Sequence, residues 1–318
     1  MQLKSFKTYL GRRLKSIKLV LHYAKYFSFK QPKTKQIVVC FDGLLPHGGL
    51  VDRLKGIISC YQIANALGYD FKILFDNPFE LTDFLEPNTI DWTFKHQEIS
   101  WHPLKAKVLY LVNDFDANPL HKIKTSNANR FYVYANIDYS KTIFPDLKAK
   151  ALETQWRSSF NALFKKSNVL DEKLNAISTL KYIAFHTRFT SLMGDFRDTT
   201  SKMLSEEAQE ALTETLLQII NRIKTETSEN AFLFSDSIKF LETVRVKTDI
   251  AVLEGHPFHM DNFDKREATS GHLKTMIDFF MISRSETVYF LKIKPMYNSS
   301  FSKYAAIIGN SNFECIEA

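Results

Sequence analysis

The sequence predicts an α/β fold built from two Rossmann-like domains that face each other across a cleft. From Gln36 onward, short runs rich in β-branched and aromatic residues alternate with segments of helical periodicity, which is typical of α/β units with mainly parallel sheets. The chain of 318 residues is about twice the length of an ordinary domain. We therefore expect an N-terminal α/β domain at 36–165 and a C-terminal Rossmann-like domain at 166–318, with ligands at the carboxyl ends of the strands.

Residues 1–35 precede this alternation and form a basic amphipathic arm. They hold ten Lys or Arg residues and no acid, so within a total charge of +7 the rest of the chain carries −3. A helical stripe of apolar residues is expected from Leu3, Phe6, Leu10, Leu14, Ile17 and Leu21. Such a helix can lie in an anionic membrane interface, and the alternative is a helix that packs on its own domain with a solvated basic face.

The first half begins with a strand and a glycine-containing loop. QIVVCF at 36–41 is a β-rich run, DGLLPHGG at 42–49 is loop-forming, and a helix starts at Leu50. Gly68 stands where a left-handed cap would end that helix. The other elements predicted in this half are strands at 71–75, 107–113 and 130–138 and a helical connection at 141–173.

The second half repeats strand and helix more regularly. Ser205 is the expected N-cap of its first helix, with Glu206 and Glu207 in the first turn near the positive end of the helix dipole. This repeat predicts a doubly wound sheet. The predicted strands are at 182–189, 231–237, 249–255 and 286–292, and the predicted helices at 205–224, 238–247, 272–284 and 299–309.

Polar residues gather at the predicted carboxyl ends of strands in the second half. Helix N-terminal amides preceded by hydroxyl residues can bind phosphate, an arginine adds charge-assisted bonds, and an aspartate can accept from a nucleobase or ribose. The set predicts a nucleotide diphosphate site without a metal. Its members are His186, Arg188, Asp236, Ser299, Ser300 and Phe301.

Each member of the set also has an ordinary structural interpretation. His186 and Arg188 could belong to a surface ion pair. The two serines could serve merely as a helix cap, and Asp236 could be an ordinary N-cap. Their joint occurrence on successive strand ends favours the site. A second polar segment, HPFHMDNFDKREATSGH, is interpreted as a loop lining the cleft and not as a metal site. Its metal-capable residues are His256, His259, Asp261, Asp264 and His272.

Three motifs resemble the fucosyltransferase superfamily with a two-domain GT-B-type architecture, which includes nodulation, core α1,6-, protein O- and bacterial α1,2-fucosyltransferases. The loop and helix HGGLVDRLKGIISCYQIANALGYDFKI, the His-x-Arg run FHTRF, and the segment from Asp278 through the Ser-Ser-Phe-Ser run carry the resemblance. It spans most of residues 36–312 and leaves the basic arm outside. The resemblance implies an inverting glycosyltransferase that uses GDP-fucose and needs no cofactor or metal. It also implies that the domain at 36–165 lies on the acceptor side and the domain at 166–318 on the nucleotide-sugar donor side.

The resemblance also implies roles for residues of the second half. Arg188 would bind the diphosphate while His186 shapes its pocket, and Asp236 would contact the guanine. Ser299, Ser300 and Phe301 would present hydroxyls and backbone amides to the phosphates.

In the first half, the resemblance places Gly48 and Gly49 where the loop approaches the donor across the cleft, with Arg53 adding positive charge. Asp52 stands where several members have Asn, and it could act as the base or orient Arg53. The segment TSLMGDFRDTT lacks the Arg-x-Gly-Asp continuation common in this family.

We expect an enzyme that elongates a bacterial surface glycan, such as lipopolysaccharide, or a lipid-linked oligosaccharide. The three cysteines match no disulfide framework or metal spacing and suit the cytoplasm. The membrane-surface interpretation of the basic arm would place the protein at the inner face of the cytoplasmic membrane. The alternatives are a transferase of the same fold with another nucleotide sugar, a non-catalytic glycan-binding protein, or a nucleic-acid-binding protein. Nucleic acid is not an expected partner, because no motif for it occurs and the chain after the arm is acidic.

Overall fold

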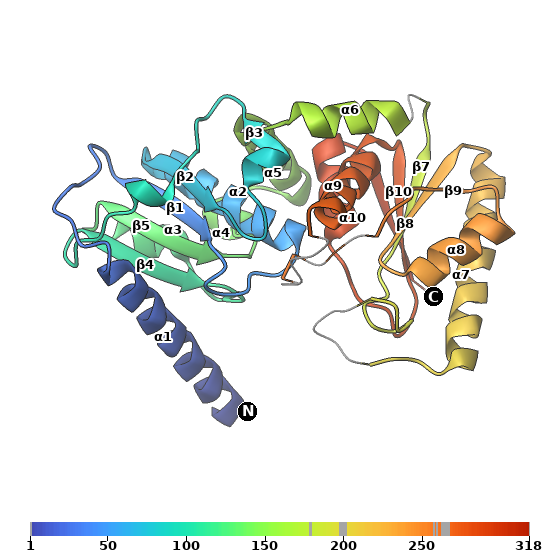
Figure 1. Cartoon of the computed structure of the whole chain (residues 1–318), viewed down its shortest axis with the longest axis horizontal. Helices are drawn as coiled ribbons and strands as arrows, with labels where there is room; N and C mark the ends of the chain where they lie inside the picture. Colours follow the sequence, from blue (N-terminus) through green and yellow to red (C-terminus); the bar gives the residue numbers. More distant parts are fainter. Residues whose placement is uncertain are drawn as a thin grey trace. The chain divides into compact units, whose positions relative to one another are not determined.

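The chain folds into two compact units, Met1–Lys165 and Lys166–Ala318. The computed structural model describes residues 2–177, 180–196, 202–256, 258, 260–261 and 268–317, and side chains from Leu10 onward except at 268–269. Each unit contains a parallel sheet with helices packed against it (Figure 1). The predicted α/β class with parallel sheets is therefore confirmed. No helix among the described residues is long and apolar enough to cross a membrane.

Unit 1 is built on a four-stranded sheet in the order β2-β1-β5-β4. All three neighbouring pairs run parallel. The strands are β1 (Gln36–Phe41), β2 (Asp70–Phe75), β4 (Ala106–Leu111) and β5 (Arg130–Ala135). These four strands lie where the sequence predicts them, because each is a short run of apolar and aromatic residues bounded by turn-forming residues.

Helix α2 (Leu50–Leu67) follows the loop after β1 and covers one face of this sheet. Gly68 ends the helix with φ of 66°, the left-handed cap expected there. At Gly56 the helix lies so close to β5 that an added Cβ would stand 2.0 Å from the carbonyl oxygen of Ala135. Glycine therefore permits the close crossing that positions the start of α2.

Helix α1 (Gln2–Ala24) packs on the opposite face of the sheet (Figure 1). Leu19 and Tyr23 are fully buried there beside Val38 and Cys40 of β1. Residues 1–35 thus belong to the same compact unit as 36–165. The helix therefore packs on its own domain, as one of the two alternatives predicts. It does so through a different side from the predicted apolar stripe, since Leu14 of that stripe is 59% exposed.

Shorter elements connect these parts of unit 1. The helical connection predicted at 141–173 is instead two helices, a short strand and the start of a further helix, because residues 164–166 pair with the distant strand β3. The elements not yet named are η1 (Leu81–Asp83), β3 (Leu85–Pro87), η2 (His96–Glu98), α3 (Pro119–Lys124), α4 (Ser140–Ile143), α5 (Ala149–Leu163) and β6 (Phe164–Lys166), which pairs with β3.

Unit 2 is built on a five-stranded parallel sheet in the order β11-β10-β7-β8-β9. Four of the strands lie within predicted runs, and β11 was missed because it is a mostly exposed edge strand without an apolar face. The strands are β7 (Ile183–Thr187), β8 (Ala231–Ser235), β9 (Ala251–Val252), β10 (Thr287–Lys292) and β11 (Asn312–Glu317).

Helices pack on this second sheet at its two faces. Because side chains alternate along a strand, Ile183 and Phe185 of β7 join the core made with α7 and α8, while His186 contacts α10. Ser205 caps α7 by accepting a hydrogen bond from the Ala208 amide, as the sequence predicts. The helices are α6 (Asn168–Ile177), α7 (Glu206–Thr227), α8 (Ile238–Lys247), α9 (Ala268–Arg284) and α10 (Phe301–Gly309).

Candidate functional site

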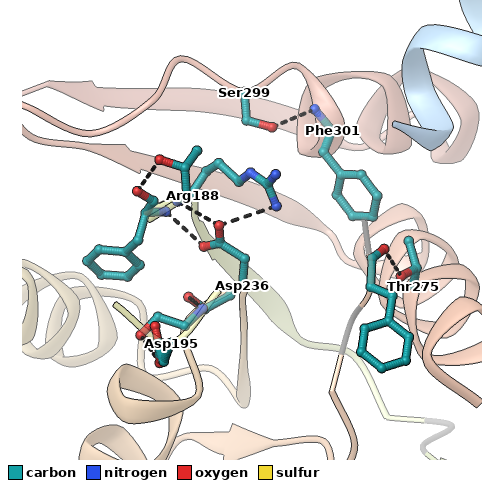
Figure 2. Close-up of polar contacts among 11 residues, drawn as sticks. Arg188, Asp195, Asp236, Thr275, Ser299 and Phe301 are labelled. Atoms are coloured by element: carbon teal, nitrogen blue, oxygen red, sulfur yellow. Dashed lines mark hydrogen bonds and ion pairs between the residues drawn. The ribbon is translucent and has the colours of Figure 1, made fainter. Parts of the chain in front are cut away.

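Arg188 and Asp236 come together at the carboxyl ends of the neighbouring strands β7 and β8. Arg188 Nη1 lies 3.3 Å from Asp236 Oδ2, with side-chain exposures of 19% and 3% (Figure 2). The same carboxylate accepts the backbone N–H groups of Phe189 at 2.8 Å and Thr190 at 2.7 Å. Asp236 therefore holds both the guanidinium and the backbone that follows it. A contact between Asp236 and guanine, which the family resemblance implies, stays a prediction.

Two opposing effects act on the pKa of the Asp236 carboxyl group. Burial raises the pKa of Asp236, whereas the Arg188 charge and the Phe189 and Thr190 amides lower it, and burial has the larger effect. A buried carboxylate with three donors is a strong anchor for an arginine, because removing either partner leaves an uncompensated charge. The anchor holds the guanidinium in one position, and the Arg188 side chain stays 19% exposed.

The loop after β7 is held from its other end by Asp195. Asp195 Oδ2 accepts hydrogen bonds from Ser237 Oγ at 2.9 Å and from the Lys239 amide at 2.8 Å, at the start of α8 (Figure 2). The guanidinium carbon of Arg188 lies 4.7 Å from the ring centroid of Phe196 in the same loop. Neither Asp195 nor Phe196 was identified from the sequence, because a single acid and a single aromatic in a loop give no periodic signal.

His186 lies near the carboxyl end of the buried strand β7, and its side chain contacts α10. Its Nδ1 lies 2.9 Å from Ser302 Oγ, and its ring packs against Phe290 and Phe301 at centroid distances of 5.4 and 5.6 Å. Burial, with a smaller effect of the Arg188 charge, lowers the pKa of His186 to about 3. The imidazole is thus neutral near pH 7, and it positions the first turn of α10 through Ser302, the last residue of the Ser-Ser-Phe-Ser run, for which the sequence predicts no role.

Ser299, Ser300 and Phe301 form the start of α10. Ser299 Oγ accepts the Phe301 amide at 3.2 Å (Figure 2), and Ser300 is the N-cap residue without a side-chain cap bond. The first intrahelical bond is from the Tyr304 amide to the Ser300 carbonyl at 3.1 Å. The amides before Tyr304 lie at the positive end of the helix dipole, where anions bind.

A backbone bond joins this helix start to Arg188. The Tyr297 amide donates to the Arg188 carbonyl at 3.3 Å, and β10, which precedes Tyr297, pairs with β7. The structure therefore brings the predicted residues of the second half to one edge of the sheet. Together they supply the guanidinium of Arg188, which is paired with Asp236, and a helix N-terminus, and both kinds of group can bind phosphate.

The glycine-containing loop of unit 1 is held by Arg53. Arg53 is 3% exposed, and it donates to the carbonyl of Gly48 at 3.2 Å and to the carbonyl of Asn77 at 2.6 Å. Its guanidinium carbon lies 5.7 and 5.3 Å from the ring centroids of Phe41 and Phe75. The structure gives Arg53 a role in supporting the loop, and its predicted contribution of charge to a donor stays untested.

Gly48 and Gly49 adopt the conformations that the start of α2 requires. Gly48 has φ of +88°, and an added Cβ would stand 2.5 Å from Asp52 Oδ2. Gly49 is the N-cap residue of α2. Asp52 in the first turn is 42% exposed at its side chain, with Lys55 Nζ 3.3 Å from its Oδ1. Asp52 thus presents a carboxylate at the end of the sheet where the strand β1 terminates.

Two further groups of this loop were missed by the sequence analysis. Asp42 Oδ2 accepts the Tyr134 hydroxyl at 2.6 Å, and the Tyr134 and Tyr23 hydroxyls lie 2.9 Å apart. The buried His47 has its Nδ1 2.9 Å from the Leu45 carbonyl, and the Asn136 amide donates to the His47 carbonyl at 3.1 Å. These bonds hold the loop against Tyr134 and Asn136, which are far from it in the sequence.

The predicted loop at 256–272 is only partly described, and the prediction is wrong for its last five residues, because helix α9 begins at Ala268 and includes the buried His272. His259 and Asp264 lie outside the described residues. Within the described part of the chain, no group of three or more His, Cys, Asp or Glu side chains is arranged to hold a metal ion.

Comparisons with known proteins support the fold. No family model matches the sequence, and no curated protein is significantly similar to it. Among solved structures, the chain is similar to NodZ α-1,6-fucosyltransferase co-crystallized with GDP, with a TM-score of 0.55 and 14% sequence identity over 86% of this chain and 92% of that chain. This similarity shows that the chain shares the GT-B-type α/β fold of that protein.

Proposed function

We propose that this protein is an inverting, metal-independent glycosyltransferase that transfers fucose from GDP-fucose to a glycan or glycolipid acceptor. The observation that carries the proposal is Arg188, held by Asp236 at a strand end and joined through Tyr297 to the start of α10. The fold likeness adds support, because the NodZ structure was co-crystallized with GDP. A transferase of this fold with another nucleotide sugar is the nearest alternative.

The proposed roles in unit 2 follow from charge. As the bond between the anomeric carbon and the β-phosphate oxygen breaks, its electron pair leaves with GDP and negative charge grows on the phosphates. Arg188 and the amides at the start of α10 would stabilise that charge, with Ser299 and Ser300 beside them. Asp236 and His186 would act as positioning residues, since their polar atoms bind Arg188, backbone amides and Ser302.

The acceptor would react from the other side of the sugar. Its hydroxyl oxygen forms the new bond to the anomeric carbon, which inverts the configuration, and its proton passes to a base. We assign the base to Asp52, whose side chain is 42% exposed at the start of α2. Gly48 and Gly49 would keep this part of the loop free of side chains, and Arg53 would hold it in place.

We further propose that the acceptor is a bacterial surface glycan or a lipid-linked oligosaccharide, and that the enzyme acts in the cytoplasm at the inner face of the membrane. Cys40, Cys60 and Cys315 are free thiols, which suits a reducing compartment. Their side chains contribute no chemistry to the proposed transfer.

Nucleotide binding tests the proposal directly. Thermal shifts of the full chain with GDP, UDP, ADP and CMP should show a selective response to GDP. R188A should weaken GDP binding and slow transfer from GDP-fucose on the order of a hundredfold, because a fixed donor to the leaving group is lost. R245A, which removes an exposed arginine of α8, is the matched control and should behave as wild type.

Two results would reject the proposal or part of it. A wild-type chain that responds to no nucleotide, or an R188A variant that keeps full GDP affinity, would remove the proposed donor site. Transfer activity that is lost in excess chelator would contradict metal independence.

A further inference from the structure

Helix α1 exposes a row of large apolar side chains, although the arm is rich in lysine and arginine. Arg12 Nη1 lies 2.9 Å from Asp114 Oδ1, Lys15 Nζ donates to the Tyr110 hydroxyl at 3.2 Å, and Leu19 and Tyr23 are buried against the sheet. These four residues follow one another at intervals of three or four, so they share one side of the helix. The helix is therefore docked on unit 1 through a side that includes two of its cationic residues.

The opposite side of the helix carries the apolar stripe. At about 100° per residue, the centre of the stripe lies about 180° from the docked side. Its residues are well exposed for aliphatic side chains, at 48% for Leu10, 59% for Leu14, 54% for Ile17 and 64% for Leu21. Four large apolar side chains in one row on a surface helix indicate an interaction surface. We call Leu10, Leu14, Ile17 and Leu21 the α1 stripe.

Positive charge surrounds the α1 stripe. Arg13 and Lys25 are exposed and lie about 60° to either side of it on the helical wheel. Residues 1–35 carry ten Lys or Arg and no acid. Exposed Phe27 and Phe29 follow the helix and add aromatic surface to the arm. Apolar residues bordered by long cationic side chains match a membrane interface, where the apolar row enters the acyl boundary and the cations meet anionic headgroups.

We propose that the α1 stripe docks this protein on an anionic lipid surface, with α1 lying in the plane of the interface. The charge of the arm argues against a second copy of the chain on this face, because two such arms would repel each other. Since unit 1 holds α1 by its opposite side, docking requires no rearrangement of the helix. The proposal rests on α1 alone and does not depend on the proposed transfer reaction.

Vesicle flotation tests this proposal on the full chain. Wild type should float with phosphatidylcholine vesicles that contain phosphatidylglycerol, float much less with phosphatidylcholine alone, and lose binding as salt is raised. L14E/I17E should weaken binding by on the order of tenfold or more, because two carboxylates enter the apolar row. V169E/V246E is the matched control, since it adds the same charge at exposed apolar residues of α6 and α8, and it should float as wild type does.

Other outcomes would overturn the proposal. Wild type that stays at the bottom of the gradient with anionic vesicles would do so, as would L14E/I17E that floats unchanged. Light scattering that shows a wild-type dimer, a monomeric L14E/I17E variant and no vesicle binding would assign the stripe to a second copy. Thermal shift of L14E/I17E with GDP should equal that of wild type, so a failure of nucleotide binding is distinguishable from a failure of docking.

Discussion

The Asp236 carboxylate holds Arg188 through an ion pair of 3.3 Å while it accepts the two backbone amides that follow Arg188 in the chain. One acid at the end of β8 thus sets the position of both the guanidinium and the loop after β7. The arrangement converts a flexible side chain into a fixed charge. Its energetic weight should be measurable separately from any activity.

D236N should destabilise the protein by about 3 kcal/mol, because an amide group cannot accept both backbone N–H groups and leaves Arg188 without its counter-charge. If Arg188 binds phosphate, the D236N variant should also bind GDP more weakly. Urea unfolding gives the first value, and calorimetry with GDP gives the second.

D249N provides the control for this substitution. Asp249 lies 3.5 Å from Lys224 with 79% of its side chain exposed. Losing this surface pair should cost between about 0 and 1 kcal/mol. Equal stabilities of D236N and D249N would show that Asp236 does not anchor the loop.

His186 should make the folded state sensitive to acid. Its pKa is lowered from 6.5 to about 3 in the folded protein, so between these values the unfolded chain binds a proton that the folded chain does not. The free energy of unfolding should therefore fall as pH drops below 6.5, by at most about 1.4 kcal/mol per pH unit from this group.

Urea unfolding of wild type and H186N at pH 7, 6 and 5 would measure this contribution. In H186N the free energy of unfolding should depend less on pH, by at most the contribution of one proton taken up on unfolding. H121N, which removes an exposed imidazole of α3, should leave that dependence in place. If wild type and H186N gave parallel pH profiles, His186 would not be the group responsible.

R53K should destabilise unit 1 by about 2 kcal/mol, because an ammonium cannot reach both the Gly48 and Asn77 carbonyls and leaves a buried acceptor unpaired. It also loses the planar contacts with Phe41 and Phe75. Chemical unfolding monitors the effect. R222K, at an exposed position of α7, should be near neutral, and an equally mild R53K would argue that the loop does not depend on this residue.

G56A should destabilise the protein by at least about 2 kcal/mol, although alanine is the better helix former. The added methyl group would stand 2.0 Å from the Ala135 carbonyl oxygen, which belongs to the backbone of β5. G11A in α1 is the control, because a Cβ there meets nothing within 4 Å, and it should be neutral or stabilising by up to about 1 kcal/mol. A shift of melting temperature in the same direction for both variants would contradict the close crossing of α2 and β5.

Much of the fold could be predicted from local patterns. Strand β1 and helix α8 coincide with their predicted runs, since the period of the apolar residues and the turn residues around them are local properties. The pattern failed at β11, an edge strand whose residues are mostly exposed, and at 141–173, where separate helices and a short strand replace one helical connection. In both places, pairing and packing with distant segments decide the structure.

The candidate site shows the same division. His186, Arg188, Asp236 and the Ser-Ser-Phe run could be selected because parallel strands end at one edge of a sheet. Their partners could not be selected: Ser302 lies 116 residues from His186, and Ser237 lies 42 residues from Asp195. Hydrogen bonds over such separations leave no period in the sequence, so only the fold reveals them.

By itself the sequence determined the α/β class, the basic arm and the apolar row of α1, because these depend on composition and on the spacing of residues within one element. The tertiary structure decided which side of α1 meets the protein and what the buried polar groups do. Because Leu19 and Tyr23 are buried against the sheet, the α1 stripe on the opposite side of the helix is exposed. Asp236 and Arg53 are held by neighbours from other elements, because buried charges must find their partners wherever the fold places them.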